Sequence, residues 1–424
     1  MQTTIWHITG KSFGFFVPFF IATWFGINKQ TDAFFFSYSI IWFAIVVSSN
    51  IGRTLAVPFI ASKRSKSEDI NAFLSSTISQ TVIYLLCSMT ICLLLLKPLL
   101  EIITKFEPKT IDLIMLISLI LSLTVVFYTA GSFIEGLLNY NKKFWFSSLA
   151  LAIRSIFIIL IMYLLRNKVG IFSIVLGYII GEGIYFLLLY YCACIEFKFK
   201  FKWNIKPNVD TIHFFKAAFS QIIFVILTAC NPLIDRAMAS FLGTGSISLL
   251  EYSEKIYFIF YNMVPFVLSR VLLTYWSESF YEHENKNFHS NVISTAIKAV
   301  LITLPVCFIV YYFKYPITHF ALNRGNFPDE KLLELSNLVG YNIFLLIPTI
   351  ILMFFINYFI VIKAINVLIL IGFVKLILNI IGNIIGIKLM GLPGIILSSV
   401  FHTTISASIL LFIFLRHRKM KILQ

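Results

Sequence analysis

Long apolar runs separated by short polar segments fill almost the whole chain. A helix crosses the ~30 Å hydrocarbon layer of a bilayer with about 20 apolar residues. Runs of at least this length occur at residues 5–25, 32–60, 73–96, 111–138, 145–165, 170–194, 212–241, 247–275, 291–313, 333–361, 365–388 and 392–415. Because a chain in lipid has to satisfy its backbone hydrogen bonds internally, the pattern predicts an all-α polytopic membrane protein with about twelve transmembrane helices.

Composition and charge support this class. Of the 424 residues, 59% are apolar and only 12% are charged, against roughly 25% charged in soluble domains. The net charge of +15 would suggest nucleic acid in a soluble protein, but in a membrane protein it indicates the positive-inside rule and contact with anionic lipids. Lysine and arginine favour the loops after even-numbered spans, which predicts a multi-pass protein of the inner (cytoplasmic) membrane with both termini in the cytoplasm and no nucleic-acid partner.

The two halves of the sequence repeat. Offsets of 217 and then 221 residues pair Gly26 with Gly243, Arg53 with Arg270, Arg154 with Lys375, and Gly170 with Gly391. Several matches in order indicate an internal duplication, which predicts a six-helix lobe at 1–205 and another at 206–424. Six spans per half give both lobes the same orientation. Such bundles bind substrate between the lobes and work by alternating access.

Charged residues within the predicted spans carry the chemistry. The basic ones are Lys11, Arg53, Arg154, Lys216, Arg236, Lys255, Arg270, Lys298 and Lys375, and the acidic ones are Asp32, Glu135, Glu182, Asp235, Glu251 and Glu254. A basic residue at mid-membrane costs about 2.5–3.5 kcal/mol, so most should face an interior cavity or each other. We expect Arg236 either to pair with the adjacent Asp235 or to snorkel, and Lys255 to be neutralised by Glu251 and Glu254. The excess of positive charge suits an anionic substrate such as a phosphate or diphosphate.

The chain has no recognisable catalytic or metal motif. We find no Gly-rich phosphate loop, H-E-x-x-H, D-x-D or G-x-S-x-G, and the cysteines and histidines are dispersed. The sequence therefore predicts no enzyme activity, no metal site and no cofactor. A coupled ion (H+ or Na+) or the membrane potential is expected to drive transport.

Four motifs carry a resemblance to a known family. They are "TDAFFFSYSI" after Gly26, "ASFLGTGSISLLEYSEKIY" at 239–257, "NRGNF" at 323–327 and "GLPGIILSSV" at 391–400. In this order they resemble the lipid II flippase (MurJ/MviN-like) family of the multidrug/oligosaccharidyl-lipid/polysaccharide (MOP) exporter superfamily. The resemblance implies a flippase of peptidoglycan or polysaccharide biosynthesis. It would carry lipid II, or a related lipid-linked oligosaccharide on a polyprenyl diphosphate, from the cytoplasmic to the outer leaflet.

The resemblance also implies site residues. Lys11 and Lys255 stand where the family has basic residues that hold the diphosphate, and we expect Arg53 and Arg270 to complete this substrate-binding set. We expect Glu254, Arg154, Lys375 and Asp235 to line or gate the cavity. The family typically has fourteen spans against the twelve predicted here, which widens the expected cargo to other polyprenyl-diphosphate-linked glycans. Expected partners are that lipid-linked saccharide and membrane lipids.

Asp32 lies directly before three phenylalanines, near the predicted start of the second span. A carboxylate is favoured there by the helix dipole and the free backbone N–H groups. We expect Asp32 either to cap the helix together with Thr31 or to act as a gate residue at the outer rim.

Two other functions compete with a flippase. A multidrug or cation exporter of the same superfamily predicts a cavity dominated by acids. An integral-membrane glycan polymerase or glycosyltransferase predicts a large outer loop or an acid dyad.

Overall fold

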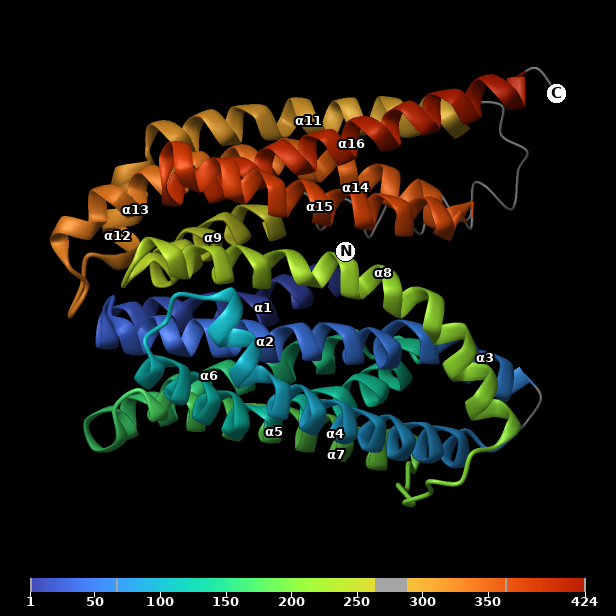
Figure 1. Cartoon of the computed structure of the whole chain (residues 1–424). Helices are drawn as coiled ribbons and strands as arrows, with labels where there is room; N and C mark the ends of the chain where they lie inside the picture. Colours follow the sequence, from blue (N-terminus) through green and yellow to red (C-terminus); the bar gives the residue numbers. More distant parts are fainter. Residues whose placement is uncertain (1, 66–67, 264–287, 363, 423–424) are drawn as a thin grey trace. The chain divides into compact units, whose positions relative to one another are not determined.

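The computed structural model describes residues 2–65, 68–263, 288–362 and 364–422, which are almost entirely helical (Figure 1). The chain divides into two compact units, Met1–Leu233 (unit 1) and Ile234–Gln424 (unit 2). This division falls within helix α8 (Val209–Ala239), whereas the lobe boundary predicted from the sequence lies between residues 205 and 206, just before that helix.

Unit 1 holds the first seven helices and most of α8. Its elements are α1 (Gln2–Phe25), α2 (Lys29–Asn50), the π-helical turn η1 (Ile51–Leu55), α3 (Ala56–Ser65), α4 (Ile70–Ile103), α5 (Pro108–Tyr140), α6 (Phe144–Val169), α7 (Phe172–Phe197) and α8. In this unit α5 packs against α2, α4 and α7, and α6 packs against α1 and α7.

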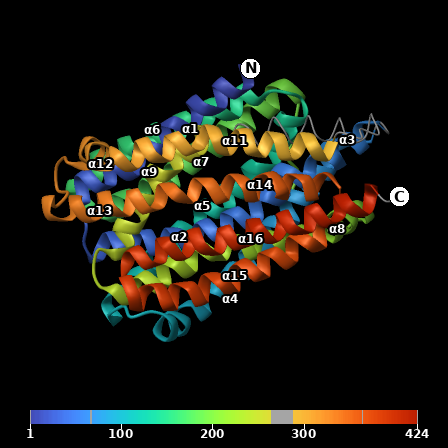
Figure 2. The same ribbon diagram turned by 90° about the horizontal axis from the view of Figure 1, so that it is seen from above.

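Unit 2 begins in the last turns of α8. It continues with the 3-10 turn η2 (Ser240–Leu242), α9 (Ser246–Met263), α11 (Phe288–Tyr312), α12 (Lys314–Leu322), α13 (Asp329–Asn342), the 3-10 turn η3 (Ile343–Leu345), α14 (Leu346–Val361), α15 (Ile365–Met390) and α16 (Leu392–Ile422). Helix α16 packs against both α14 and α15 (Figure 2).

The predicted spans correspond to helices. Ten helices among the described residues are long and apolar enough to cross a membrane. The span expected at 5–25 corresponds to α1, in which Phe13–Phe25 is an apolar stretch. The span expected at 247–275 starts as α9 and continues outside the described residues. Large apolar side chains point outward from these helices, such as Leu94 (74% exposed) and Leu389 (77% exposed), as expected for surfaces that face lipid.

The backbone supports the predicted repeat. Gly26 and Gly243, each shortly before a helix, have φ values of +67° and +96°. Gly170 and Gly391, at the ends of α6 and α15, have nearly equal dihedral angles (φ 55°, ψ −131° and φ 67°, ψ −134°). Glycine tolerates these positive φ values without a Cβ clash. The glycines paired by sequence therefore occupy similar positions beside helix ends.

Candidate functional site

Arg53 lies on a local irregularity that sequence periodicity does not reveal. The predicted span 32–60 is one continuous run, but its helix changes to the π-helical turn η1 at Ile51. The backbones of this turn and of α5 approach closely: a Cβ at Gly136 would lie 2.7 Å from the Gly52 carbonyl oxygen. π-Helical turns within α-helices occur frequently at functional sites. Arg53 lies within this turn.

Arg53 forms a buried ion pair across unit 1. Its Nε donates to Glu135 Oε2 at 2.8 Å, and its Nη2 donates to the Tyr128 hydroxyl at 3.1 Å. The Tyr185 hydroxyl donates to the same Glu135 oxygen at 3.0 Å. The Glu135 side chain is 5% exposed and that of Arg53 is 31% exposed. The carboxylate is thus enclosed, while part of the guanidinium stays accessible.

A second arginine pair lies close to the first. Arg154 Nε on α6 is 3.0 Å from Glu182 Oε1 on α7, and Glu182 also interacts electrostatically with Arg53. The second carboxylate oxygen of Glu182 is buried and has no hydrogen-bond partner among the described residues. Tyr38 and Tyr178 are close enough to interact electrostatically with Arg154. The two pairs and these tyrosines form one polar cluster within unit 1.

Unit 2 contains a comparable network on α8 and α9. Arg236 Nη2 bonds to Glu251 and, at 2.8 Å, to Glu254, while Lys255 Nζ lies 2.8 Å from Glu251 Oε1. The expected pairing of Lys255 with a neighbouring glutamate is therefore confirmed. The expected pairing of Arg236 with Asp235 is wrong, because adjacent residues on a helix point in different directions.

Asp235 belongs instead to a chain of buried polar groups. Asn383 Nδ2 donates to Asp235 Oδ1 and to Asn379 Oδ1, both at 2.7 Å, and Asn379 Nδ2 lies 3.2 Å from His402 Nε2. The half-buried Lys375, on α15, interacts electrostatically with both Asp235 and His402. This chain joins α8, α15 and α16 through the apolar interior of unit 2.

The described residues contain no group of three or more His, Cys, Asp or Glu side chains arranged to hold a metal ion.

Asp32 is buried (2% exposed) near the start of α2, but it is not the cap. Asn28 is the cap: its side chain accepts from the backbone N–H groups of Gln30 and Thr31, and the Thr31 hydroxyl accepts from Asn28 N at 2.9 Å. The prediction that Asp32 caps the helix is wrong, because α2 starts at Lys29, earlier than the apolar run suggests. Asp32 as a gate residue stays a prediction.

The first turn of α2 also carries a charge pair at the surface. Lys29 Nζ lies 2.6 Å from Glu107 Oε1, and this ammonium lowers the pKa of the Glu107 carboxyl group. Both side chains are more than half exposed, so the pair adds little stability.

Separate substitutions at Asn28 and Asp32 distinguish capping from gating. We expect Asn28→Ala to lower the free energy of unfolding by about 0.5–2 kcal/mol, because the capping box is lost. Asp32→Asn leaves this cap intact, and a gate role predicts slower transport without a matching loss of stability. Thermal unfolding and transport rates of both variants test this. Transport by Asp32→Asn at the native rate would end the gate hypothesis.

The structure describes the side chains of two of the four predicted diphosphate-binding residues. Lys11 lies on α1, and Arg270 lies outside the described residues. Arg53 and Lys255 are described, and each is held by a buried glutamate. Among the predicted gating residues, Glu254 contacts Arg236, and Arg154 contacts Glu182.

The glutamate partners Glu135, Glu182 and Glu251 were not among the predicted site residues, although each is an acid within an apolar span. Each of them neutralises an arginine or lysine, and Tyr128 and Tyr185 add hydrogen bonds to Arg53 and Glu135. Such an arrangement can hold charge in the membrane and present a guanidinium or ammonium group to an anion.

Comparison with known proteins identifies a family. The family model described as "Lipid II flippase MurJ" matches residues 21–424. The "Probable lipid II flippase MurJ" of Aquifex aeolicus (strain VF5) is 25% identical over 347 residues, 78% of this chain and 66% of that protein. The Borreliella burgdorferi protein of the same name is 23% identical over 307 residues, 72% of this chain and 60% of that protein. The matched region thus spans about two thirds or less of these relatives.

Solved structures show the same fold. "Lipid II flippase MurJ, inward closed conformation" has a TM-score of 0.83 and 24% identity, and the match covers 97% of this chain and 87% of that one. An inward-facing multidrug resistance MATE family transporter of the MOP superfamily has a TM-score of 0.80 and 12% identity, and the match covers 99% and 98%. The predicted MOP-type helical fold is confirmed.

Proposed function

We propose that this chain, which belongs to the lipid II flippase MurJ family, is a flippase. Its cargo would be lipid II or a related polyprenyl-diphosphate-linked saccharide. A flippase moves its lipid without making or breaking a covalent bond, in keeping with the prediction that the chain is not an enzyme. The observation that carries the proposal is the Arg53 guanidinium, which is partly accessible within an apolar helix bundle and held by an enclosed carboxylate.

The glutamates act as resident counter-anions in this proposal. Without cargo, Glu135 and Glu182 neutralise Arg53 and Arg154, which lowers the cost of keeping these cations within a bilayer. A diphosphate carries more charge and more acceptor oxygens than one carboxylate, and guanidinium groups bind such oxygens in pairs. The diphosphate takes over the accessible face of Arg53, while Tyr185 continues to donate to Glu135.

Lys255 plays the corresponding part in unit 2. Its ammonium contacts Glu251, which is also bonded to Arg236, so Glu251 remains neutralised when Lys255 turns to an anion. A lysine binds phosphate as a point charge with rotatable donors, which permits release as well as capture. Lys11 and Arg270 join Arg53 and Lys255 in the proposed diphosphate-binding set.

The direction of transport follows from the charge on the cargo. An inside-negative membrane potential favours outward movement of an anion by ~2.3 kcal/mol per unit charge per 100 mV. We propose that this potential, or a coupled H+ or Na+, drives alternating access in the inner membrane with both termini in the cytoplasm. Asp235, Lys375 and Glu254 lie in the charged networks through which such coupling would act.

The pairing of the intramembrane acids favours this function over a cationic-drug exporter. Glu135, Glu182, Glu251 and Glu254 each contact an arginine or lysine of the same unit. A site for a cationic drug needs a carboxylate free to receive the cation. These four carboxylates are already paired with cations of the chain, which favours an anionic cargo.

Lys11→Ala and Lys255→Ala test the proposed site in cells. Each variant is expected to fail to complement a flippase-deficient strain, because loss of one charged contact to the diphosphate costs about 2–5 kcal/mol of binding. Immunoblots of membrane fractions check that the variants insert. The matched control is Lys388→Ala, an exposed lysine in the last turn of α15, which should complement fully. Full complementation by both test variants contradicts the assignment.

A further inference from the structure

An irregular segment joins α7 to α8 in unit 1, at residues 198–208 (the strap), with the sequence KFKFKWNIKPN. It starts where α7 ends, at Lys198, whose left-handed backbone (φ 52°, ψ 33°) turns the chain away from the helix axis. The Phe199 N–H then donates to the Ala193 carbonyl oxygen at 3.2 Å, which closes the end of the helix.

The strap is bound along its length to a polar face of α4. Its backbone and Asn204 exchange hydrogen bonds of 3.0–3.2 Å with four α4 side chains: Lys202 N to Ser75, Asn204 N to Ser79, Asn204 Nδ2 to Ser76, and Gln80 Nε2 to the Lys206 carbonyl oxygen. These bonds satisfy backbone N–H and C=O groups, which in a strand or helix would be satisfied by regular backbone hydrogen bonds. A segment without secondary structure is therefore held in one conformation.

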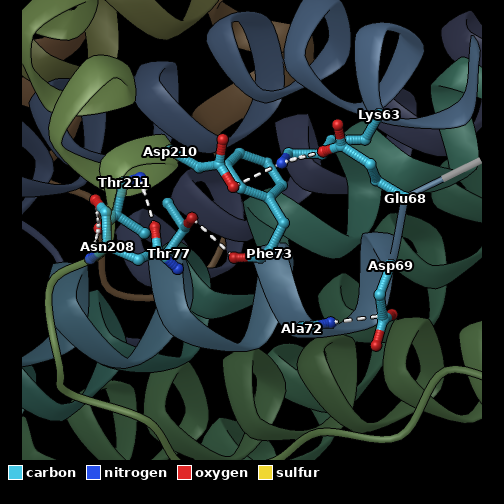
Figure 3. A network of polar contacts seen from close by, with 9 residues as sticks. All are labelled: Lys63, Glu68, Asp69, Ala72, Phe73, Thr77, Asn208, Asp210 and Thr211. Carbon is cyan, nitrogen blue, oxygen red and sulfur yellow. Dashed lines mark hydrogen bonds and ion pairs between the residues drawn. The ribbon is translucent and has the colours of Figure 1, made fainter. Parts of the chain in front are cut away.

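The far end of the strap is fixed as well (Figure 3). Asn208 and Thr211 cap the start of α8 reciprocally, with Thr211 N donating to Asn208 Oδ1 at 2.8 Å and Asn208 N donating to Thr211 Oγ1 at 3.1 Å. Lys63, at the end of α3, bonds to both Asp210 and Glu68. The strap is thus preorganised between three helices of the same unit.

The acids near the strap are each paired with a lysine outside it. Lys63 holds Asp210 and Glu68, and Lys143 Nζ lies 2.9 Å from Glu196 Oε2 at the end of α7. The strap lysines are Lys198, Lys200, Lys202 and Lys206, all exposed. Within the described ranges none of them forms an ion pair, so they present uncompensated positive charge.

Apolar side chains accompany these lysines. Phe199 is buried and Phe201 is half-buried, whereas Trp203 (56% exposed) and Ile205 (48% exposed) project outward. A cavity of about 370 Å³ opens at the start of the strap, lined by Tyr190, Cys194, Lys198, Phe199, Lys200 and Phe201. Two ammonium groups and three aromatic rings thus surround one concave surface at the end of a membrane-spanning helix.

We propose that the strap is a binding site for the headgroup of an anionic phospholipid. Lys198 and Lys200 bind the phosphate at the cavity, the aromatic rings contact the glycerol region, and Trp203 and Ile205 enter the interfacial layer of the bilayer. Aromatic residues favour this layer, and the cytoplasmic leaflet supplies anionic lipids to basic segments beside spans. The exposed Trp203 and Ile205 favour a lipid over an acidic protein, because an indole ring and an aliphatic side chain beside lysines suit the headgroup layer of a bilayer. This inference does not rest on the proposed flippase activity.

Native mass spectrometry of the full chain in detergent tests the site, with phosphatidylglycerol and phosphatidylcholine titrated separately. The test variant is Lys198→Gln/Lys200→Gln/Lys202→Gln. Surface lysines contribute roughly fivefold each to anionic lipid binding, so the triple variant should bind phosphatidylglycerol up to about a hundredfold more weakly. Phosphatidylcholine binding should not change.

The matched control is Lys109→Gln/Lys168→Gln/Lys388→Gln, which removes three exposed lysines at other helix ends. It should retain phosphatidylglycerol binding, and so should the arginine version of the test triple, which keeps the charge. Circular dichroism and size exclusion verify that the variants are folded. Native phosphatidylglycerol affinity in the glutamine triple, or an equal loss in the control, overturns the proposal. Loss of phosphatidylglycerol binding in the arginine triple variant also overturns the proposal.

Discussion

Replacing Arg53 and Glu135 together by glutamine is expected to slow flipping of a polyprenyl-diphosphate saccharide at least about thirtyfold while the chain remains folded. The double change removes both charges of a buried pair, so neither is left without a counter-ion. Loss of a buried charge contact to the cargo costs about 2–5 kcal/mol, and 2 kcal/mol already corresponds to about thirtyfold. Initial flipping rates in proteoliposomes measure transport, and thermal unfolding measures whether the variant remains folded.

The single variant Arg53→Gln is less informative. It leaves the Glu135 carboxylate buried without its cation, which typically lowers the free energy of unfolding by about 3–5 kcal/mol. The matched control for the double variant is Lys331→Gln/Glu334→Gln, an exposed ion pair at 2.7 Å in unit 2. It should flip at the native rate. A double variant at Arg53 and Glu135 that also flips at the native rate would show that this pair is structural only.

Glu251→Gln is expected to produce a large loss of stability. Glu251 is 2% exposed and contacts both Arg236 and Lys255, so its neutralisation leaves two cations sharing Glu254. Breaking a buried ion pair costs about 3–5 kcal/mol, because the remaining charge is not compensated. Denaturant unfolding in mixed micelles measures this cost.

Glu334→Gln is the control for this measurement, since Glu334 and its partner Lys331 are each about 40% exposed. Exposed pairs contribute about 0–1 kcal/mol. If Glu251→Gln unfolds at the same denaturant concentration as this control, the network around Arg236 does not stabilise unit 2.

The spans and the duplication could be predicted from the sequence because both depend on local pattern. A membrane-spanning helix needs its own apolar run, so the run at 365–388 predicts α15 (Ile365–Met390) closely. Gly170 and Gly391 could be paired because each ends a helix with a backbone conformation that glycine adopts easily. Where a polar turn precedes the apolar run, as at Asn28, the predicted start was too late.

The partners of the charged residues could not be predicted, because they depend on how helices pack. Arg53 and Glu135 are 82 residues apart in sequence, and their contact depends on the close approach of η1 and α5 at Gly52 and Gly136. The strap is a similar case, since the serines of α4 look like ordinary small residues of a span until Asn204 lies against them. The number of charged residues within apolar spans indicated that they are functionally important. It could not show which acidic side chain neutralises which basic one.

Flipping by the purified chain tests the central claim most directly. A fluorescent polyprenyl-diphosphate saccharide is placed in the inner leaflet of proteoliposomes, and its arrival in the outer leaflet is followed with a membrane-impermeant quencher. Native protein should transfer the lipid well above the rate of protein-free vesicles and of the Arg53→Gln/Glu135→Gln variant, and should transfer an uncharged analogue without the diphosphate much more slowly. Transfer no faster than in protein-free vesicles, or equal transfer of the uncharged analogue, would contradict a diphosphate-binding flippase.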